Sequence, residues 1–545
     1  MNDLEKIRRQ LVWDRLLAIV EDQAQTLMRT AFSTVVREAG DLSAGVFDER
    51  GRMLAQAITG TPGHVNAMAR SVNNFLEVYP LEILRPGDVL VTNDPWLGTG
   101  HLNDFTVLTP VFLHNNPVAL FASTSHIADV GGRGFGPDAN SVFEEGINIP
   151  ISYLMNAGEP NETLRRIIRA NVRDPVVAEG DLHSLTACNR LGGERLCAAM
   201  VEFELRDLKE ISDYICDASE LAMEEEIGRL KNGIYTYSMT VDGYDEPVDI
   251  ACALTIKDKT IDINFSGSSA VSQYGINVPL NYTEAYACFG VRCLVGNNIP
   301  NNFGSLRTIR VDAPEGTILN ARSPNAVSAR HALGQMLPDV VFGCLSQIIP
   351  ESVPAEGASC IWNPVLMNAD SVNSNNNNDT FVINPIFNGG TGARPTKDGL
   401  STTAFPSGVR TTSTEINEVT SPLIIWRRQY LPNSAGDGQY RGGFGQVVEI
   451  GHLEDLPFMV SKMFDRIEHA PRGRSGGGPG RAGRVYLRGG ASLRGKGKET
   501  IPAGNTLVME TPGGGGMGDS KNRPVDLREI DDKNGLSTFM VGGSD

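Results

Sequence analysis

Four residues that commonly bind metal ions lie close together in the first quarter of the chain. Asp94, His101 and Asp104 fall in one loop-like stretch, and His126 stands at the end of the second of two strand-like segments that follow it. The chain has eight histidines in 545 residues, so two of them near a pair of aspartates form a conspicuous group. Imidazole and carboxylate groups are typical ligands of zinc, manganese and iron. A single histidine at a strand end is more often a hydrogen-bonded structural residue, so the arrangement must decide between the two interpretations.

The segments next to these residues are expected to form a β-hairpin. Residues 105–112 and 118–124 have strand-like composition, and the turn sequence 114–117 separates them. Strands joined by such a short turn pair in antiparallel fashion. Asp104 and His126 are equally far from the centre of the turn, so they should face each other at the open end of the hairpin, about 5 Å apart.

His101 precedes Asp104 by three residues in a glycine-containing loop and can fold back onto the same point. The sequence therefore predicts a metal site formed by His101, Asp104 and His126. Three protein ligands leave coordination positions open, as is typical of catalytic rather than structural metal sites. The pattern alone does not name the metal, because zinc, manganese and iron all accept this ligand set; among these divalent metals zinc is our first expectation.

The rest of the sequence predicts an α+β fold, a large multi-layer body with antiparallel sheets and a glycine-rich C-terminal β region. Helical patterns are expected at 3–38, 65–78, 162–232 and 331–348, with strand-like runs between and after them. The expected organisation is an N-terminal α+β region with the metal hairpin at 1–160, a helical segment at 161–232, a β-rich region at 233–330 and a mixed, glycine-rich region at 331–545.

Two low-complexity features concern loops. The glycine runs 476–480 and 513–516 lie among strand-like segments, so ordered loops are favoured over flexible linkers. The polar stretch Asn373–Asn378 is expected to be an exposed loop.

Composition excludes some classes of partner and location. The formal net charge of -17 argues against nucleic acid or an anionic membrane as the partner. The eight cysteines form no CxxC pair, which favours free thiols in a reducing compartment. The sequence shows neither a secretory signal nor an apolar run of about 20 residues, so a cytoplasmic protein is expected.

Longer motifs resemble those of the hydantoinase B family. This family includes N-methylhydantoinase, 5-oxoprolinase, caprolactamase and subunits of acetone and acetophenone carboxylases. The matching segments run nearly from end to end and are Asp41–Ser43, Gly63-His64, Asn93–Pro95, Gly100–Asp104, Ser125–Gly132, Glu145–Ile147, Phe265–Ser269, Pro314–Asn320, Gly389–Arg394, Glu415–Glu418, Tyr440–Gly445 and Thr511–Gly516.

The resemblance also implies a metal site. In relatives a His-x-x-Asp pair and a downstream histidine hold the metal, and the matching residues here are His101, Asp104 and His126. One loop departs from the family pattern: many relatives have Gly-Gly-Thr-His, whereas this chain has Gly98-Thr-Gly-His101. The histidine is kept, but the loop shape and the substrate preference could differ.

The resemblance also implies a function and a partner. The chain would be the metal-binding subunit of an ATP-dependent cyclic-amide hydrolase of the hydantoinase, oxoprolinase or lactamase type. A hydantoinase A-type subunit would bind ATP and Mg and phosphorylate a lactam or hydantoin, which a metal-activated water would then attack. The sequence fits this division, because its closest approach to a P-loop, 490–497, lacks the Ser or Thr that should follow the lysine. A hetero-oligomer follows from this expectation.

Proton transfer is assigned to Asp129 or Glu145, since both follow the metal strand closely. Asp94 could orient a ligand histidine. For all three carboxylates, a role in capping a loop is an equal alternative. Spacing assigns no role to His64 or Arg330, nor to His331.

Other functions remain open. The main alternative is a subunit of an ATP-dependent ketone carboxylase of the acetone or acetophenone carboxylase type, which would use the same metal to stabilise an enolate. The chain length favours the hydrolase. A non-catalytic scaffold is disfavoured because His101 and Asp104 are present, and a standalone metal amidohydrolase because its HxH motif is absent.

Overall fold

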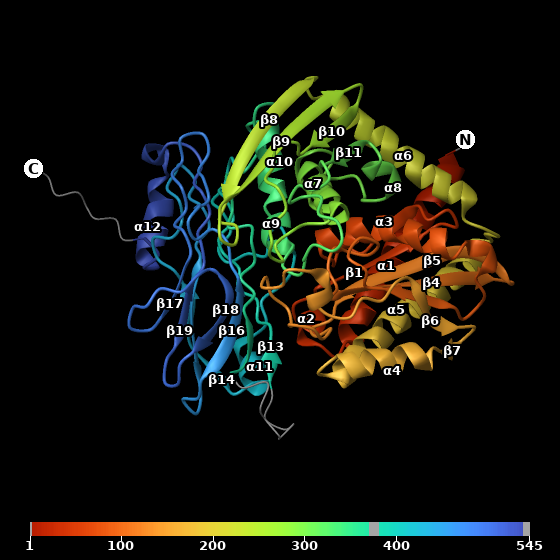
Figure 1. Cartoon of the computed structure of the whole chain (residues 1–545). Coiled ribbons are helices and arrows are strands. Elements are labelled where there is room, and N and C mark those ends of the chain that lie inside the picture. Colours follow the sequence, from red (N-terminus) through yellow and green to blue (C-terminus); the bar gives the residue numbers. More distant parts are fainter. Residues whose placement is uncertain (1–2, 370–380, 538–545) are drawn as a thin grey trace, which may run out of the picture. The chain divides into compact units, whose positions relative to one another are not determined.

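The computed structural model describes residues 3–369 and 381–537, so the predicted loop at Asn373–Asn378 lies outside the described residues. The chain divides into two compact units, and Figure 1 labels helices and strands that belong to them. Unit 1 comprises Met1–Phe135, Ala139–Thr236 and Cys252–Arg330, and unit 2 comprises Gly136–Asp138, Tyr237–Ala251 and His331–Asp545. Helices and mainly antiparallel sheets occur in both units, which confirms the predicted α+β class.

The described part of unit 1 contains a seven-stranded antiparallel sheet in the order β2-β1-β5-β4-β3-β6-β7. Its strands are β1 (Leu42–Phe47), β2 (Met53–Gln56), β3 (Val89–Thr92), β4 (Asp104–Leu113), β5 (Asn116–His126), β6 (Ser152–Asn156) and β7 (Glu159–Pro160). Strands β4 and β5 occupy the middle of the sheet and are buried along most of their length.

The β4–β5 hairpin has the predicted register at its open end, where Asp104 pairs with His126. Its turn places His114 and Asn115 at φ angles of 51° and 64°. Two successive positive φ angles are typical of the turns that match the twist of a two-stranded hairpin. A bulge after Val111 shifts the pairing only near the turn, so the end with Asp104 and His126 keeps the predicted alignment.

Helices cover both faces of this sheet. The helices of unit 1 are α1 (Asp3–Thr30), α2 (Thr34–Arg37), α3 (Pro62–Val78), α4 (Glu162–Asn171), α5 (Pro175–Glu202), α6 (Lys209–Gly228), α7 (Leu280–Leu294) and α8 (Phe303–Leu306). Helices α1 and α5 contact each other and one face of the sheet, and α3 contacts the other face and α7.

Alternation along β4 and β5 determines which side chains meet α3. Leu108 and Leu120 belong to the cluster that packs on α3. Side chains two residues apart point to the same face of a strand, so Asp104 and His126 share the α3 face with these leucines. The Thr106 hydroxyl hydrogen-bonds that of Thr124 at 2.9 Å on this face. The hairpin therefore presents a polar end and an apolar middle to α3.

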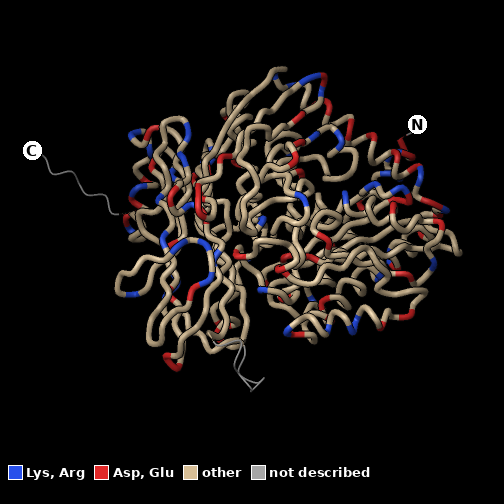
Figure 2. The backbone as a smooth tube through the Cα atoms, in the orientation of Figure 1, with Lys and Arg blue, Asp and Glu red and all other residues tan. Residues whose placement is uncertain are grey.

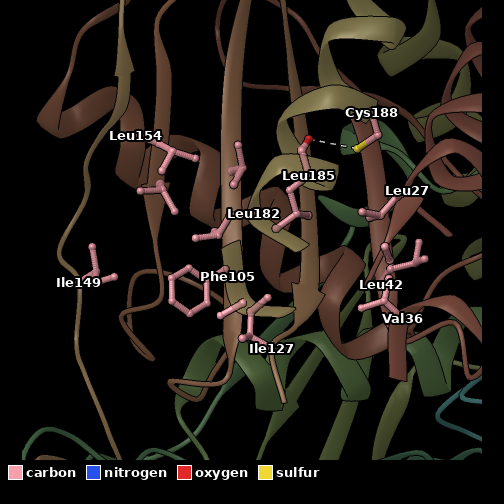
Figure 3. Close-up of a cluster of buried hydrophobic side chains, with 14 of the residues drawn as sticks. Leu27, Val36, Leu42, Phe105, Ile127, Ile149, Leu154, Leu182, Leu185 and Cys188 are labelled. Atoms are coloured by element: carbon pink, nitrogen blue, oxygen red, sulfur yellow. Dashed lines mark hydrogen bonds between the residues drawn. The ribbon is translucent and has the colours of Figure 1, made fainter. Parts of the chain in front are cut away.

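The opposite face of the same hairpin end is anchored in a hydrophobic cluster (Figure 3). Phe105 and Ile127, which directly follow Asp104 and His126, are both buried there. They pack with residues of α1 and α5 that include Leu27, Leu182 and Leu185. Full burial of one such side chain contributes about 1.5–3 kcal/mol. This packing holds the two neighbouring polar residues at fixed positions.

A second sheet has the order β11-β10-β9-β8, with β8 (Gly233–Val241), β9 (Val248–Lys257), β10 (Thr260–Asn264) and β11 (Ile309–Asp312). The pairing of β10 with β11 is parallel, and the pairing of β9 with β10 is antiparallel.

Unit 2 contains two four-stranded sheets in its described part, with the orders β13-β12-β16-β18 and β14-β15-β19-β17. The strands are β12 (Val365–Asn368), β13 (Val382–Ile383), β14 (Leu423–Tyr430), β15 (Gln446–His452), β16 (Phe458–Met463), β17 (Arg484–Leu487), β18 (Lys496–Ile501) and β19 (Leu507–Glu510). Its helices are α9 (His331–Gly334), α10 (Leu337–Leu345), α11 (Thr414–Val419) and α12 (Val525–Lys533). The helix expected over 331–348 is split into α9 and α10. The break falls at Gln335 and Met336. Pro338, in the first turn of α10, has no amide hydrogen to donate to the Gly334 carbonyl, so a continuous helix would lose this hydrogen bond.

The glycine runs of unit 2 are ordered loops, as predicted. Their backbones pack directly on one another: Gly514 donates to the Gly443 carbonyl at 2.9 Å and accepts from the Gly436 amide at 2.8 Å. A Cβ atom added to Gly514 would overlap the backbone of Thr391. These loops require glycine because backbone, rather than side chain, fills the space beside them.

Charges and thiols agree with the composition. Acidic and basic residues are interspersed along both units (Figure 2). Each of the eight cysteines lies in the described part of the chain, where none forms a disulfide, and six of them are buried. Within residues 3–369 and 381–537, no helix is both long enough and apolar enough to span a membrane.

Candidate metal centre

The structure brings the three predicted ligands together around the Asp104 carboxylate. Its Oδ1 atom lies 2.7 Å from His101 Nε2 and 3.4 Å from His126 Nδ1. All three residues are buried, and each offers a ligand atom within 4.8 Å of the others. Asp104 and His126 come from the paired ends of β4 and β5, and His101 comes from the loop before β4.

The hydrogen bonds of His101 determine which ring nitrogen can bind a cation. Nδ1 lies 2.9 Å from the backbone carbonyl oxygen of Ser328. A carbonyl can only accept, so Nδ1 carries the proton. Burial and the Arg330 charge lower the pKa of His101 to about 4, so the ring is neutral near pH 7 and Nε2 has a free lone pair. This lone pair faces the Asp104 carboxylate. Both groups are hydrogen-bond acceptors and repel each other, and a bound cation would remove this repulsion.

His126 supplies the second ring nitrogen that is available to a cation. Its Nε2 is buried and has no hydrogen-bond partner among the described residues. A buried polar atom left unsatisfied costs about 1–3 kcal/mol. The ring centroids of His126 and His101 are 5.2 Å apart, and the Phe135 ring lies edge-on to both, at 4.9 and 5.6 Å. Two imidazoles and a carboxylate beside an apolar wall fit a zinc, manganese or iron ion.

The second oxygen of Asp104, Oδ2, is held by a separate set of side chains. Arg330 Nη2 and Thr99 Oγ1 donate to it, and His64 Nε2 lies 2.9 Å away. The Arg330 guanidinium is buried and lies 3.9 Å from the centroid of the Tyr282 ring. Burial raises the pKa of Asp104, but the positive charges of His64 and Arg330 hold it well below its ordinary value. Asp104 is therefore ionised, with one oxygen oriented by Arg330 and the other facing the imidazoles.

His64 and Arg330, which spacing left without a role, are both part of the site. His64 lies in the first turn of α3, on the side of the sheet that Asp104 faces. Its Nδ1 is 3.5 Å from Asp41 Oδ1, and the backbone amide of His126 donates to the Asp41 carbonyl. The match of Gly63-His64 to the family pattern is a sequence signal that could have drawn attention to His64. No local signal could have placed Arg330, which is 226 residues from Asp104 in sequence.

The loop before β4 contains a glycine, Gly100, that its surroundings require. Gly100 has a φ angle of +101°, which favours glycine. A Cβ atom at this position would lie 2.6 Å from Arg330 Nε and 3.1 Å from Tyr282 Cβ. Glycine at position 100 therefore lets the loop pass close to the arginine that holds Asp104.

The other predicted carboxylates have partners of their own. Asp129 forms an ion pair with Arg173 at 2.6 Å and accepts from the Gly131 amide. Asp94 caps its loop by accepting from the amides of Trp96 and Leu97.

The structure also shows the contacts of Glu145, which was predicted to transfer a proton, and of His331, to which spacing assigned no role. Glu145 is buried and accepts hydrogen bonds from the amides of Val327 and Ser328, each at 2.7 Å. Burial raises the pKa of Glu145 to about 8. His331 belongs to unit 2, where its Nε2 lies 3.1 Å from Asn363 Oδ1.

Comparison with known proteins adds family membership to this geometry. A family model described as hydantoinase B/oxoprolinase matches residues 5–520. A protein provisionally named as the B-type subunit of a D-/L-hydantoinase, from Pseudomonas sp. (strain NS671), is 26% identical over 552 residues, covering 96% of this chain and 91% of its own length. The ATP-dependent caprolactamase from Pseudomonas jessenii has the same fold, with a TM-score of 0.88 at 23% identity, over 99% of this chain and 95% of that one. A nucleotide-free acetone carboxylase also shares the fold, with a TM-score of 0.86 at 18% identity, over 98% of this chain and 78% of that one. Because the family model spans nearly the whole sequence, the chain belongs to the hydantoinase B/oxoprolinase family.

Proposed function

We propose that this chain is the metal-binding subunit of an ATP-dependent cyclic-amide hydrolase that opens a lactam or a hydantoin. The observation that carries the proposal is the buried group of His101, Asp104 and His126 in a member of this family. A structural role alone would leave one imidazole nitrogen unsatisfied and would place two acceptors in contact.

The three side chains would hold one divalent cation, with zinc favoured and manganese or iron compatible. When bound, the cation supplies Lewis-acid chemistry, which polarises an oxygen and lowers the pKa of a water ligand. His101 contributes Nε2, because Ser328 accepts the proton on Nδ1. Arg330 and Thr99 hold the second oxygen of Asp104, so that the first faces the imidazoles.

ATP would be used on a second subunit. The sequence has no complete P-loop, and a relative that aligns along nearly its whole length is named as a B-type subunit. We therefore expect a hydantoinase A-type partner that binds ATP and Mg. An amide is a poor electrophile, so transfer of a phosphoryl group to its oxygen would prepare the ring carbon for attack by water. A cytoplasmic location remains a prediction.

The group that transfers the proton is the least constrained part of the proposal. Asp129 and Glu145 both remain predictions for this role. The ion pair of Asp129 with Arg173 and the two amide contacts of Glu145 are also compatible with purely structural roles.

Metal analysis tests the ligand assignment. We expect about one divalent ion per chain in the wild type and little in His126→Ala. His183→Ala is the matched control, because His183 is exposed on α5 and lies outside the cluster. Equal metal content in the wild type and His126→Ala would contradict the assignment.

Activity assays test the division of labour. The isolated chain should hydrolyse neither ATP nor a lactam, and addition of an A-type partner should restore ATP-dependent opening of a hydantoin, 5-oxoproline or caprolactam. Strong ATP hydrolysis by this chain alone would refute the proposal.

The acetone carboxylase fold is the reason to test the alternative, a ketone carboxylase subunit. A hydrolase should transfer oxygen from labelled water into the new carboxylate and should not respond to bicarbonate. A carboxylase would require bicarbonate and a ketone, and its product would gain one carbon. Bicarbonate-dependent consumption of acetone or acetophenone, without activity on any cyclic amide, would decide for the carboxylase.

A further inference from the structure

The short segment Val327–Arg330 contacts two of the three proposed ligands from a distant part of the sequence. The Ser328 carbonyl accepts the Nδ1 proton of His101. Arg330 donates through Nη2 to Asp104 and through Nε to the Thr99 carbonyl. The conformation of this segment therefore sets the orientation of both ligands.

Glu145 anchors the segment at its start. The Glu145 side chain is 3% exposed, and its Oε1 atom accepts from the backbone amides of Val327 and Ser328. The residue itself is fixed by the preceding 3-10 turn, Val142–Glu144, because its own amide donates to the Val142 carbonyl. One carboxyl oxygen thus holds two consecutive peptide groups, and Ser328 presents its carbonyl to His101.

The contact matters because a neutral imidazole has two tautomers. Binding of a cation through Nε2 requires that the ring proton reside on Nδ1. A correctly placed acceptor next to Nδ1 selects that tautomer and fixes the ring plane, and loss of such a partner typically weakens metal binding. The Ser328 carbonyl is this acceptor. Glu145 holds the amide of the same residue, one peptide group earlier, and the Ala329 amide, which shares the peptide group of the Ser328 carbonyl, donates to the Gly275 carbonyl at 2.7 Å.

We propose that Glu145 is a positioning residue: through the Ser328 carbonyl it fixes the Nδ1–H tautomer of His101 and leaves Nε2 free for the cation. This role differs from the proton transfer predicted for Glu145. It rests on the proposed metal site for its function, but the tautomer can be measured in metal-free protein.

The protonation state of Glu145 indicates an informative substitution. With a pKa raised to about 8 by burial, the side chain is mainly a neutral acid at pH 7. Its second oxygen is buried and has no hydrogen-bond partner among the described residues. A glutamine has nearly the same shape as the neutral acid, and its amide oxygen can accept from the same two backbone amides. Leucine has a similar volume and can accept from neither.

The experiment compares Glu145→Gln with Glu145→Leu, using Glu144→Gln as the control. Glu144 is the sequence neighbour and forms an ion pair with Arg133. Metal-free protein labelled with 15N only at histidine is examined by long-range 15N–1H correlation, which distinguishes the two tautomers. His101→Gln assigns the resonance, and Zn2+ affinity is measured by competition with a chromophoric chelator.

The wild type, Glu145→Gln and Glu144→Gln should show the Nδ1–H tautomer at His101 and equal Zn2+ affinity. Glu145→Leu should show a mixture of tautomers and an affinity about 10–100-fold lower. If Glu145→Leu does not fold, Glu145→Asp replaces it, because the shorter side chain cannot reach both amides and should give an intermediate loss.

Two results would overturn the proposal. One is an unchanged tautomer and Zn2+ affinity in a folded Leu or Asp variant. The other is loss of the Nδ1–H tautomer or of Zn2+ binding in Glu145→Gln. Failure of the proposed function would look different, since the wild type would then bind no divalent ion while the tautomer still depended on Glu145.

Discussion

Replacement of Asp104 by asparagine tests the charge balance of the site. The substitution keeps the size of the side chain and removes one negative charge. In the wild type this charge faces the buried Arg330 guanidinium, and the two side chains are 0% and 2% exposed. The oxygen of the new side-chain amide should turn toward Arg330 and Thr99, both of which are donors. Its NH2 group would then face His101 Nε2, which is an acceptor when the ring is neutral.

The magnitude follows from these contacts. Loss of one partner of a buried ion pair costs about 3–5 kcal/mol, since the other charge remains buried without compensation. The new hydrogen bond to His101 should return about 1 kcal/mol. We therefore expect metal-free Asp104→Asn to be less stable than the wild type by about 2–4 kcal/mol. With zinc at a hundredfold excess over its Kd, the wild type gains a further stabilisation of about 2.7 kcal/mol that the variant should lack.

Urea unfolding in EDTA measures the loss of stability in the metal-free protein, and urea unfolding with zinc measures the stabilisation by the metal. The partner variant is Arg330→Met, which removes the guanidinium but keeps an apolar stem against Tyr282. The double variant buries neither charge, so its loss of stability should be smaller than the sum of the two single losses. Additive losses in EDTA would show that the two charges do not depend on each other. An equal zinc-induced shift of the urea midpoint in the wild type and Asp104→Asn would refute the assignment of Asp104 as a ligand.

Three further substitutions follow from the structure. Gly477→Ala should lower the unfolding temperature markedly, because its Cβ would overlap the backbone of a neighbouring glycine loop. The control, Gly478→Ala, should be tolerated, because the atom nearest to its Cβ would be 3.5 Å away. Equal unfolding temperatures of the two variants would contradict the backbone packing. The folded-state pKa of Glu145 is raised from 4.5 to about 8, so the contribution of Glu145 to the free energy of unfolding falls as pH rises through that window. In urea titrations between pH 5 and 8.5, Glu145→Gln should therefore become more stable relative to the wild type. A difference in stability that stays constant with pH would count against the raised pKa. Gly100→Ala should lower the free energy of unfolding by about 1–3 kcal/mol, because an alanine is strained at the positive φ of this position. It should also displace Arg330 and so weaken zinc binding, as measured by competition with a chromophoric chelator. Unchanged zinc affinity would show that the loop tolerates the change.

The sequence was most informative where one local element determines the geometry. A hairpin with a short turn has a fixed register, so the position of the turn was enough to place Asp104 opposite His126. His101 could be added because it is only three residues away. These are short-range relations, and they identified all three members of the cluster.

Residues that reach the site from elsewhere in the chain could not be found in this way. Arg330 and Ser328 contact the ligands across more than two hundred residues of sequence, and spacing carries no information at that range. Helix α7, which brings Tyr282 beneath Arg330, was not predicted at all. Most of its residues are buried, and a helix that is buried on several sides lacks the alternation of polar and apolar faces by which surface helices are recognised.

The division of the chain into units shows the same limit. Unit 2 takes in Gly136–Asp138 and Tyr237–Ala251, which are separated in sequence from its main part. Composition along the chain cannot reveal such discontinuous units, because it varies only with sequence position. The predicted four-segment organisation therefore remains a description of sequence regions.

The two oxygens of Asp104 link the local and the distant parts of the site. Oδ1 faces the histidines that the hairpin and its preceding loop position, and Oδ2 is held by Arg330 from the segment that Glu145 anchors. Arg330 is a cation and would repel a bound metal ion, so its presence costs affinity unless the carboxylate lies between the two positive charges. The observed geometry meets this requirement, because Arg330 and the imidazoles contact different oxygens of the same carboxylate. The three candidate ligands are thus predictable from short-range spacing, whereas the charge balance of the site depends on contacts of Asp104 with His64 and Arg330 that only the folded chain reveals.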